Sequence, residues 1–360
     1  MNRRSFLQSS ATLSAAFAGP AILRAADQGP AKKAIIGTGE HTYECHHYWG
    51  TLPDHIKWGE THGVTVDEAG FIYILNNTGA SSVRHQDAVA VFDPSGRFVR
   101  SFGSEYSASN IHTVGHGLDL RKEGNTEYLY LSLTWANLVV KTTLNGELVW
   151  AQSVPWESGV YTERKQFIPT NVAFHPTDGS LYITNGYGTP YIHQYSADGR
   201  HLRTFGGKGG KDQHGKFTNP HGCWVDNRPG RTPMLVVCDR GNQRLEYFTL
   251  EGQYVSTVEG LTNPDHIDVR GDLLLIPDLH ARVTLLGKDN QVITHLGFDQ
   301  AWTDRVLNKG GQGGLVMRTK PETWEDGRFI HPHDACFDRD GNIFVVEWVR
   351  GGRVTKLRKV

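Results

Sequence analysis

Histidine recurs in this chain at one place, directly before a run of alternating apolar residues. His62, His116 and His221 are each followed by glycine at the head of such a run, and His333 is followed by aspartate. Neutral imidazole is a preferred ligand of zinc and similar ions, and three imidazoles leave an open position for a substrate. The four histidines therefore indicate a metal site, provided that the fold brings them together.

Internal repetition predicts a fold that can do so. Six segments share one pattern: a polar pair, an apolar alternation, a turn with Gly or Asp, and a second alternation, which together are typical of a β-hairpin. The segments are residues 61–75, 115–132, 169–185, 220–239, 264–278 and 332–348. Most are followed by a third and a fourth strand joined by an Asp-Gly type of turn. Four strands in each of six units predict an all-β chain, a six-bladed β-propeller of NHL-type repeats.

The two ends of the chain predict how the propeller closes. The sixth unit ends after the "RVTKLRK" strand and lacks an outer strand, whereas residues 34–45 form a strand-like segment before the first hairpin. We expect this N-terminal strand to complete the last blade. Such closure leaves no open edge between the first and last blades.

When the six repeats are aligned on their polar pair, one position of that pair can be compared across all of them. The six residues at this position are His62, His116, Thr170, His221, Asp265 and His333. Because the innermost strand of each blade lines the central channel, we expect these side chains to converge on one mouth of it. Each histidine taken singly is also explained as a loop residue. Four at the same repeat position favour a metal site.

Chain direction predicts which other residues reach this mouth. The first strand of each blade leaves the mouth and the second returns, so that Asn77, Tyr187 and Arg240 lie at returning ends. Four insertions precede first strands, at residues 101–114, 153–168, 206–218 and 299–328. Long loops are therefore expected on the histidine-bearing face, as around a substrate pocket.

Five local motifs resemble those of the peptidyl-hydroxyglycine amidating lyases, a family of NHL-repeat propellers: "GHGLDL", "LYITNGYG", "NPHGCWV", "VVCDRGNQRLEYF" and "HPHDACFDRDGNIFV". The resemblance covers residues 59–358. It implies a catalytic zinc ion held by His116, His221 and His333. It also implies a structural calcium ion, deeper in the channel, held by Asp334 and by the backbone carbonyls of Val64 and Leu118.

The same resemblance implies catalytic roles for two further residues. Tyr187 matches the tyrosine that takes the proton from the substrate hydroxyl, and Arg240 matches one of two arginines. Two positions depart from the family: Asn77 replaces the second arginine, and His331 replaces a methionine next to the zinc ion. His331 adds a further nitrogen that could contact the metal. By their place in the repeat, His62 and Asp265 are further candidates for metal contact.

Three functions remain open from the residues. The first is a zinc-dependent lyase that cleaves a hydroxylated N-substituted substrate to an amide and glyoxylate. The second is a non-catalytic NHL propeller that binds a ligand or a protein partner. The third is a metal-dependent hydrolase resembling the six-bladed lactonases. A histidine-rich mouth argues against the third, because those sites resemble calcium sites built from carboxylate and amide side chains.

Composition limits the partners. Charged residues make up 21% of the chain, the net charge is −1, and no basic run is present, which argues against a nucleic-acid partner. We expect a monomer that acts on a small molecule or a peptide.

The four cysteines have neither CxxC nor zinc-ribbon spacing, and we expect buried free thiols. Cys223 and Cys238 are predicted on adjacent strands of one hairpin, and Cys45 and Cys336 on neighbouring strands.

The N-terminus resembles a twin-arginine export signal. "NRRSFLQ" precedes a mildly apolar run and the small residues Ala25 and Ala26, and this run is too short to span a bilayer. The alternative is an amphipathic or membrane-anchoring N-terminus. We expect a signal over residues 1–26, a propeller over residues 27–360, and a protein exported to the bacterial periplasm without a membrane span.

Replacing Arg3 and Arg4 together by lysine is expected to stop export, because the twin-arginine route requires that pair. The measurement is an immunoblot of periplasmic and cytoplasmic fractions for the parent and the variant. Equal amounts of both proteins in the periplasm would remove the export prediction.

Overall fold

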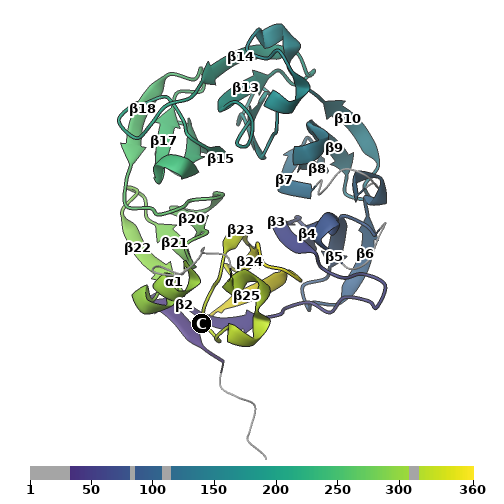
Figure 1. Cartoon of the computed structure of the whole chain (residues 1–360), viewed down its shortest axis with the longest axis vertical. Helices are drawn as coiled ribbons and strands as arrows, with labels where there is room; N and C mark the ends of the chain where they lie inside the picture. Colours follow the sequence, from purple (N-terminus) through teal and green to yellow (C-terminus); the bar gives the residue numbers. More distant parts are fainter. Residues whose placement is uncertain (1–32, 82–85, 108–114, 308–315) are drawn as a thin grey trace, which may run out of the picture. The chain divides into compact units, whose positions relative to one another are not determined.

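Strands dominate the structure, a computed structural model that describes residues 33–81, 86–107, 115–307 and 316–360. Six antiparallel sheets are arranged around a common centre (Figure 1), which confirms the predicted six-bladed β-propeller. The expected export signal, residues 1–26, lies outside the described residues.

Each of the first five blades contains four strands that follow one another in the chain. Blades one to three are β3 (Glu60–Val66), β4 (Ile72–Asn77), β5 (Val89–Phe92) and β6 (Phe98–Phe102); β7 (Gly115–Glu123), β8 (Thr126–Leu133), β9 (Leu138–Thr143) and β10 (Leu148–Gln152); and β11 (Asn171–Phe174), β12 (Leu181–Thr184), β13 (Tyr191–Tyr195) and β14 (His201–Gly206). Blades four and five are β15 (Pro220–Asp226), β16 (Met234–Asp239), β17 (Arg244–Phe248) and β18 (Tyr254–Val258); and β19 (Asp268–Arg270), β20 (Leu273–Asp278), β21 (Arg282–Leu286) and β22 (Val292–Leu296).

Blade six joins the two ends of the chain, as predicted. Its inner strands are β23 (Pro332–Phe337), β24 (Ile343–Glu347) and β25 (Arg353–Lys359), and its outer strands are β2 (His41–His47) and β1 (Ile35–Thr38). Antiparallel pairing of β2 with β25 places Cys45 opposite Leu357. Figure 1 shows the purple β2 beside the yellow strands of this blade. The edge of β25 is thereby covered.

Both faces of most strands are buried, because the blades stack side by side around the channel. An apolar cluster fills each of the six junctions between neighbouring blades. At the junction of blades five and six, for example, Leu275 and Val283 pack with Tyr43, Cys45 and Val345. These clusters hold neighbouring blades together, and the innermost strand β3 lies between β7 and β23.

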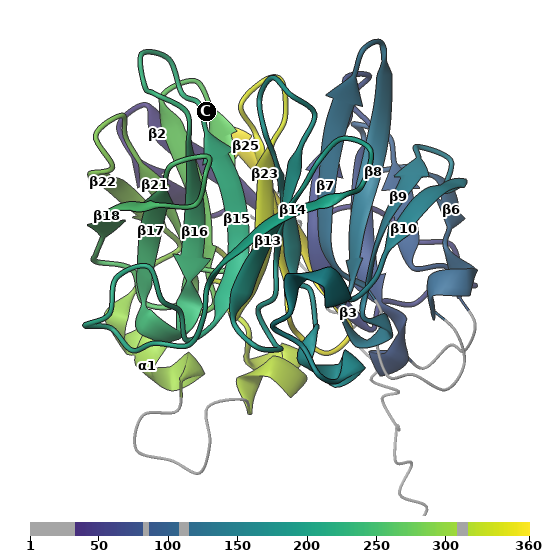
Figure 2. The same ribbon diagram turned by 90° about the horizontal axis from the view of Figure 1, so that it is seen from above.

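The helical turns gather on one face of the propeller (Figure 2). They include η3 (Thr134–Ala136) and η6 (Arg240–Asn242), which follow second strands, and α1 (Gln300–Val306) and η7 (Met317–Thr319) in the segment before blade six. First strands begin on this same face. The predicted insertion 299–328 is described over residues 299–307 and 316–328. The second of these parts contributes Arg318 to the pocket that is discussed below.

The four cysteines are buried free thiols, as expected. Cys223 and Cys238 lie on the adjacent strands β15 and β16, but Cys223 is opposite Val237, so the two thiols point into different clusters. The prediction that Cys45 and Cys336 lie on neighbouring strands was wrong. Strands β24 and β25 separate β2 from β23, because the outer position of blade six is filled from the N-terminal side.

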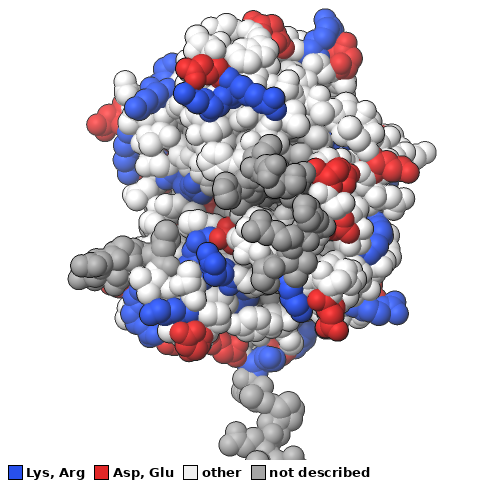
Figure 3. Space-filling view, turned by 45° about the vertical axis from the view of Figure 1, so that its right-hand side comes forward, with Lys and Arg blue, Asp and Glu red and all other residues white. Residues whose placement is uncertain are grey.

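Charges of both signs are interspersed over the face drawn in Figure 3, in line with the small net charge. No helix in the described ranges combines the length and apolar character needed to cross a bilayer.

A chain that begins at Trp49 lacks β1 and β2, and we expect it to melt on the order of 10 °C lower or to associate, because the edge of β25 and part of an apolar cluster become exposed. A chain that begins at Lys33 retains both strands and is the control. Thermal melting and size-exclusion chromatography check this. Equal melting temperatures for the two chains would contradict closure by the N-terminal strands.

Candidate metal centre and substrate pocket

Three of the predicted histidines converge on the channel mouth. His116, His221 and His333 lie near the starts of β7, β15 and β23, are buried, and bring ligand atoms within 4.8 Å of one another. The Nε2 atoms of His116 and His221 are 3.2 Å apart. The three belong to blades two, four and six, so alternate blades supply the imidazoles.

The remaining blades hold these rings in place. Each ring donates its Nδ1 hydrogen to the backbone carbonyl of the residue at the same repeat position in the next blade. The pairs are His116 with Thr170 at 3.1 Å, His221 with Asp265 at 2.9 Å, and His333 with His62 at 2.8 Å. Because Nδ1 carries the hydrogen in all three rings, every Nε2 lone pair points inward.

The residue after the histidine explains how the carbonyls come so close. A Cβ atom on Gly117 would stand 2.2 Å from the Thr170 carbonyl oxygen, and a Cβ on Gly222 would stand 2.4 Å from that of Asp265. Any side chain at these two positions would push away the carbonyl that orients the histidine. In His116-Gly117 and His221-Gly222, the glycine therefore allows the close approach of the carbonyl that orients the histidine.

The protonation state suits a metal. Burial lowers the pKa of His116, His221 and His333 well below the usual range, so the rings are neutral. Nε2 of His333 has no hydrogen-bond partner among the described residues. A cation at the centre would relieve the repulsion between inward lone pairs.

The dimensions of the centre also suit zinc. Tetrahedral zinc with bonds of about 2.0–2.1 Å requires its nitrogen ligands to be about 3.3 Å apart, close to the 3.2 Å between His116 and His221. A cavity of about 10 Å³ is lined by the three rings together with Asp334 and His266, which is room for about one water-sized particle. The donor set therefore fits a single zinc-like ion.

The other candidates for metal contact lie outside the group of three. His62 supplies its backbone carbonyl to His333, and its Nδ1 donates to the Glu60 carbonyl at 3.1 Å. Burial lowers the pKa of His62 to about 4. His331 contacts the Leu279 carbonyl at 2.7 Å, away from the three nitrogens. These two are neighbours of the centre.

Asp265, the last of those candidates, is the ion-pair partner of Arg240. Its carboxylate accepts from Arg240 Nη1 at 2.7 Å. Burial raises the pKa of Asp265 to about 7, against the opposing effect of Arg240. The backbone carbonyl of Asp265 orients His221. Asp265 therefore positions two residues of the centre, His221 through its carbonyl and Arg240 through its carboxylate.

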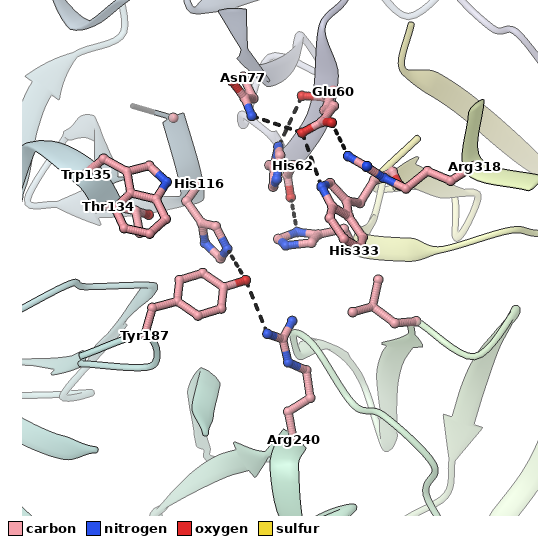
Figure 4. A pocket seen from close by; sticks show the side chains of 13 residues that line it. Glu60, His62, Asn77, His116, Thr134, Trp135, Tyr187, Arg240, Arg318 and His333 are labelled. Atoms are coloured by element: carbon pink, nitrogen blue, oxygen red, sulfur yellow. Dashed lines mark hydrogen bonds and ion pairs between the residues drawn. The ribbon is translucent and has the colours of Figure 1, made fainter. Parts of the chain in front are cut away.

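Tyr187 and Arg240 reach the centre from their returning strand ends, as predicted. The Tyr187 hydroxyl lies 3.1 Å from Nε2 of His116 and 3.1 Å from Nε2 of His221, and accepts from Arg240 Nη2 at 3.2 Å. Burial raises the pKa of Tyr187, and the Arg240 guanidinium opposes that shift. Figure 4 shows the hydroxyl between His116 and Arg240. The phenol thus stands where a substrate oxygen would meet the metal.

A cavity of about 480 Å³ opens above the histidines, and its opposite wall is built around Glu60 (Figure 4). The Glu60 carboxylate accepts from Asn77 at 3.0 Å, from the Trp348 indole at 3.1 Å and from Arg318. Arg318 lies in η7 and stacks on Trp348, with its Cζ 3.7 Å from the ring centroid. Its charge is therefore neutralised by Glu60.

Sequence reasoning missed Glu60, Trp135, Arg318 and Trp348, all of which line the cavity. Glu60 and Trp348 carried a signal, because each stands at the start of a first strand or the end of a second strand. For Arg318 the signal was coarse: residues 299–328 were predicted as a loop on this face, but the segment has no repeat phase that would single out one residue. Trp135, on η3, is half exposed at the cavity.

The residues expected to hold calcium lie next to His266. Asp334 accepts the backbone N–H of Val64 at 2.8 Å, and its other oxygen is 2.6 Å from Nδ1 of His266. Nε2 of His266 is 3.3 Å from the carboxylate of Asp119, the residue after Leu118. The His266 ring thus stands between two carboxylates. Calcium held by Asp334 and the carbonyls of Val64 and Leu118 stays a prediction.

Comparison with solved structures defines the class of fold. The chain is similar to virginiamycin B lyase from Staphylococcus aureus, with a TM-score of 0.53, 14% identity, and coverage of 88% of this chain and 100% of that one. A candidate gluconolactonase gives a TM-score of 0.54 at 13% identity, over 88% of this chain and 94% of that one. At such identities these likenesses establish the propeller fold alone.

Comparison with curated sequences identifies more specific relatives. The chain is 26% identical over 283 residues to peptidyl-glycine alpha-amidating monooxygenase of Mus musculus, and 25% identical over 283 residues to the Rattus norvegicus protein; each match covers 77% of this chain. It spans about a quarter of the length of these relatives, 26% in both cases. No model of a protein family matches the chain.

Replacing His221 by alanine is expected to remove bound metal from protein purified without a histidine tag, because two imidazoles remain where three are needed. The loss should exceed the roughly 10–100-fold typical of an outer hydrogen-bond partner. The control is His331→Ala, a buried histidine outside the group, which should retain the metal. Zinc per chain by mass spectrometry is the measurement. Equal zinc in both variants would refute the assignment of ligands.

Proposed function

We propose that this protein is a zinc-dependent lyase that cleaves an α-hydroxylated N-substituted amide into a primary amide and an aldehyde. Glyoxylate is the aldehyde when the substrate ends in hydroxyglycine. The observation that carries the proposal is the convergence of three neutral imidazoles with the Tyr187 hydroxyl, 3.1 Å from two of them. The likeness to the amidating enzymes supports it.

Zinc bound to the three imidazoles would lower the pKa of a substrate hydroxyl and polarise its oxygen. The positive charge of such an ion, together with Arg240, would favour the phenolate form of Tyr187. The Tyr187 phenolate oxygen, which lies at the mouth of the centre, can then take the hydroxyl proton. The carbon–nitrogen bond breaks as the carbonyl forms, and the amide nitrogen takes up a proton. No water is consumed. Arg240 donates to the tyrosine oxygen and stabilises negative charge there.

The cavity supports a substrate larger than its reacting end. The guanidinium groups of Arg240 and Arg318 are each paired with a carboxylate, and Asn77 is bound to Glu60. The walls therefore offer little free positive charge. Trp135 and Trp348 provide aromatic surface. This arrangement favours a substrate with an apolar or aromatic acyl group and places little demand on a terminal carboxylate.

We also propose that the protein works outside the bacterial cytoplasm, on the strength of the twin-arginine motif, and as a monomer on a small molecule or peptide. A non-catalytic propeller and a lactonase-like hydrolase are the alternatives. Metal analysis separates them from the lyase: one zinc per chain supports the lyase, whereas a metal-free protein favours a binding propeller. Calcium as the sole metal favours the hydrolase.

Replacing Tyr187 by phenylalanine is expected to leave zinc bound and to lower the rate by at least about a hundredfold, the usual scale for a lost general base. Tyr106→Phe is the control, because the Tyr106 hydroxyl is buried without a hydrogen-bond partner among the described residues. The assay measures release of aldehyde and amide from N-benzoyl-α-hydroxyglycine and from its carboxamide.

The outcomes distinguish mechanism from substrate. Full activity of the Tyr187 variant would contradict its role as base. Activity that survives removal of zinc from the His221→Ala variant would contradict the metal mechanism. Zinc-loaded parent protein that cleaves neither compound would exclude both as substrates, and faster cleavage of the carboxamide would support the neutral substrate class.

A further inference from the structure

A further level of the repeat lies two positions before the aligned histidines. The described residues at this level are Glu60, Ile168, Asn219, Asn263 and His331. In four blades the backbone carbonyl of this residue accepts the N–H of a residue at or just after the end of the second strand. The pairs are Ile168 with Tyr187 at 3.4 Å, Asn219 with Arg240 at 2.9 Å, Asn263 with Leu279 at 3.1 Å and His331 with Trp348 at 2.9 Å. This level therefore supports residues that line the cavity.

The side chain of Asn219 also reaches the metal centre. Its Oδ1 accepts from Nε of Arg240 at 2.7 Å, and its Nδ2 donates to the backbone carbonyl of Gly186. These two partners determine the orientation of the amide, because a reversed amide would place donor against donor and acceptor against acceptor. The oxygen of Asn219 must therefore face the guanidinium.

Arg240 is thereby held at all three of its guanidinium nitrogens. Nε donates to Asn219, Nη1 donates to Asp265 at 2.7 Å, and Nη2 donates to the Tyr187 hydroxyl at 3.2 Å. A guanidinium is a rigid planar fork, so two fixed nitrogens determine the direction of the third. The bond to Asp265 alone would leave the plane free to turn about that contact. Asn219 removes this freedom and directs Nη2 at the tyrosine oxygen.

The bond to Gly186 completes a closed circuit between blades three and four. Gly186 precedes Tyr187, so Asn219 is bound both to Arg240 and to the turn that carries Tyr187. This turn packs closely on blade four, since a Cβ atom on Gly186 would stand 2.8 Å from the Pro220 carbonyl oxygen. One side chain between the two blades therefore sets the position of Arg240 relative to Tyr187.

We propose that Asn219 is a positioning residue of the lyase reaction and holds the Arg240 guanidinium against the Tyr187 oxygen. The proposal rests on the function proposed above. The repeat supplies a matched control, because Asn263 stands at the same level of blade five within the same Thr-Asn-Pro sequence. Its Oδ1 has no hydrogen-bond partner among the described residues.

Asn219→Ala is expected to lower kcat about tenfold to a hundredfold and to leave KM within about twofold of the parent, because a misdirected guanidinium weakens the transition state. Asn263→Ala should keep the parent's rate. In an Arg240→Ala background, Asn219→Ala should change the rate by less than about twofold, since it acts through that arginine. The parent's rate in Asn219→Ala, or a full loss in the Arg240→Ala background, would overturn the proposal.

Hydrogen exchange at Nε of Arg240 tests the same contact without an activity assay. The signal is observed by NMR and assigned by its absence from Arg240→Lys. The Nε hydrogen should exchange at least about tenfold faster in Asn219→Ala than in the parent. Asn219→Asp retains an acceptor oxygen, so this variant should preserve the slow exchange, and it serves the test if the alanine variant fails to fold.

Equal exchange in the parent and Asn219→Ala would refute the positioning role, as would fast exchange in folded Asn219→Asp. A zinc-loaded parent that cleaves neither test compound would count against the proposed function alone, because the exchange rates still decide whether Asn219 holds Arg240.

Discussion

The hydrogen bond from a histidine of one blade to a backbone carbonyl of the next is the interaction on which this structure depends. It occurs three times, with the donors on blades two, four and six and the acceptors on blades three, five and one. Each bond crosses an interface between blades, so the geometry of the centre depends on the closure of the whole ring. Closure in turn requires β1 and β2 in blade six, since they cover the edge that the last strands leave.

These bonds also determine what the imidazoles can do. An imidazole whose Nδ1 hydrogen is donated to a carbonyl is held in one tautomer and one orientation, as the outer partners of metal ligands usually require. Burial keeps the three rings neutral. One residue deeper, burial alone would also oppose charge on His266, but the carboxylates of Asp334 and Asp119 outweigh it and hold the pKa of His266 well above its usual range. The pKa of His266 and the pKa values of the three histidines thus shift in opposite directions, because only His266 lies between two carboxylates.

The pocket shows the same dependence on neighbours. Arg240 and Arg318 approach the cavity from opposite sides, yet each is neutralised by a buried carboxylate from another part of the chain. A guanidinium near a substrate site therefore does not by itself indicate an anionic substrate. The two arginines differ in their contacts besides the carboxylate. Arg240 donates to the Tyr187 hydroxyl at the metal centre, whereas Arg318 stacks on the Trp348 ring.

Sequence alone determined the repeat, and with it the six blades, the closure from the N-terminal side and the convergence of four histidines on one channel mouth. Periodicity carries this information because a strand exposes alternate residues and a blade repeats its strands, so one repeat position maps to one level of the channel. It also placed Tyr187 and Arg240 on the correct face. The choice of His116, His221 and His333 among those four histidines came from the resemblance to the amidating lyases. The tertiary structure alone decided that Arg318 joins the pocket and that His266 stands between two carboxylates. Both depend on distances between segments without a common period, and such distances are set only when the packed blades bring those segments together.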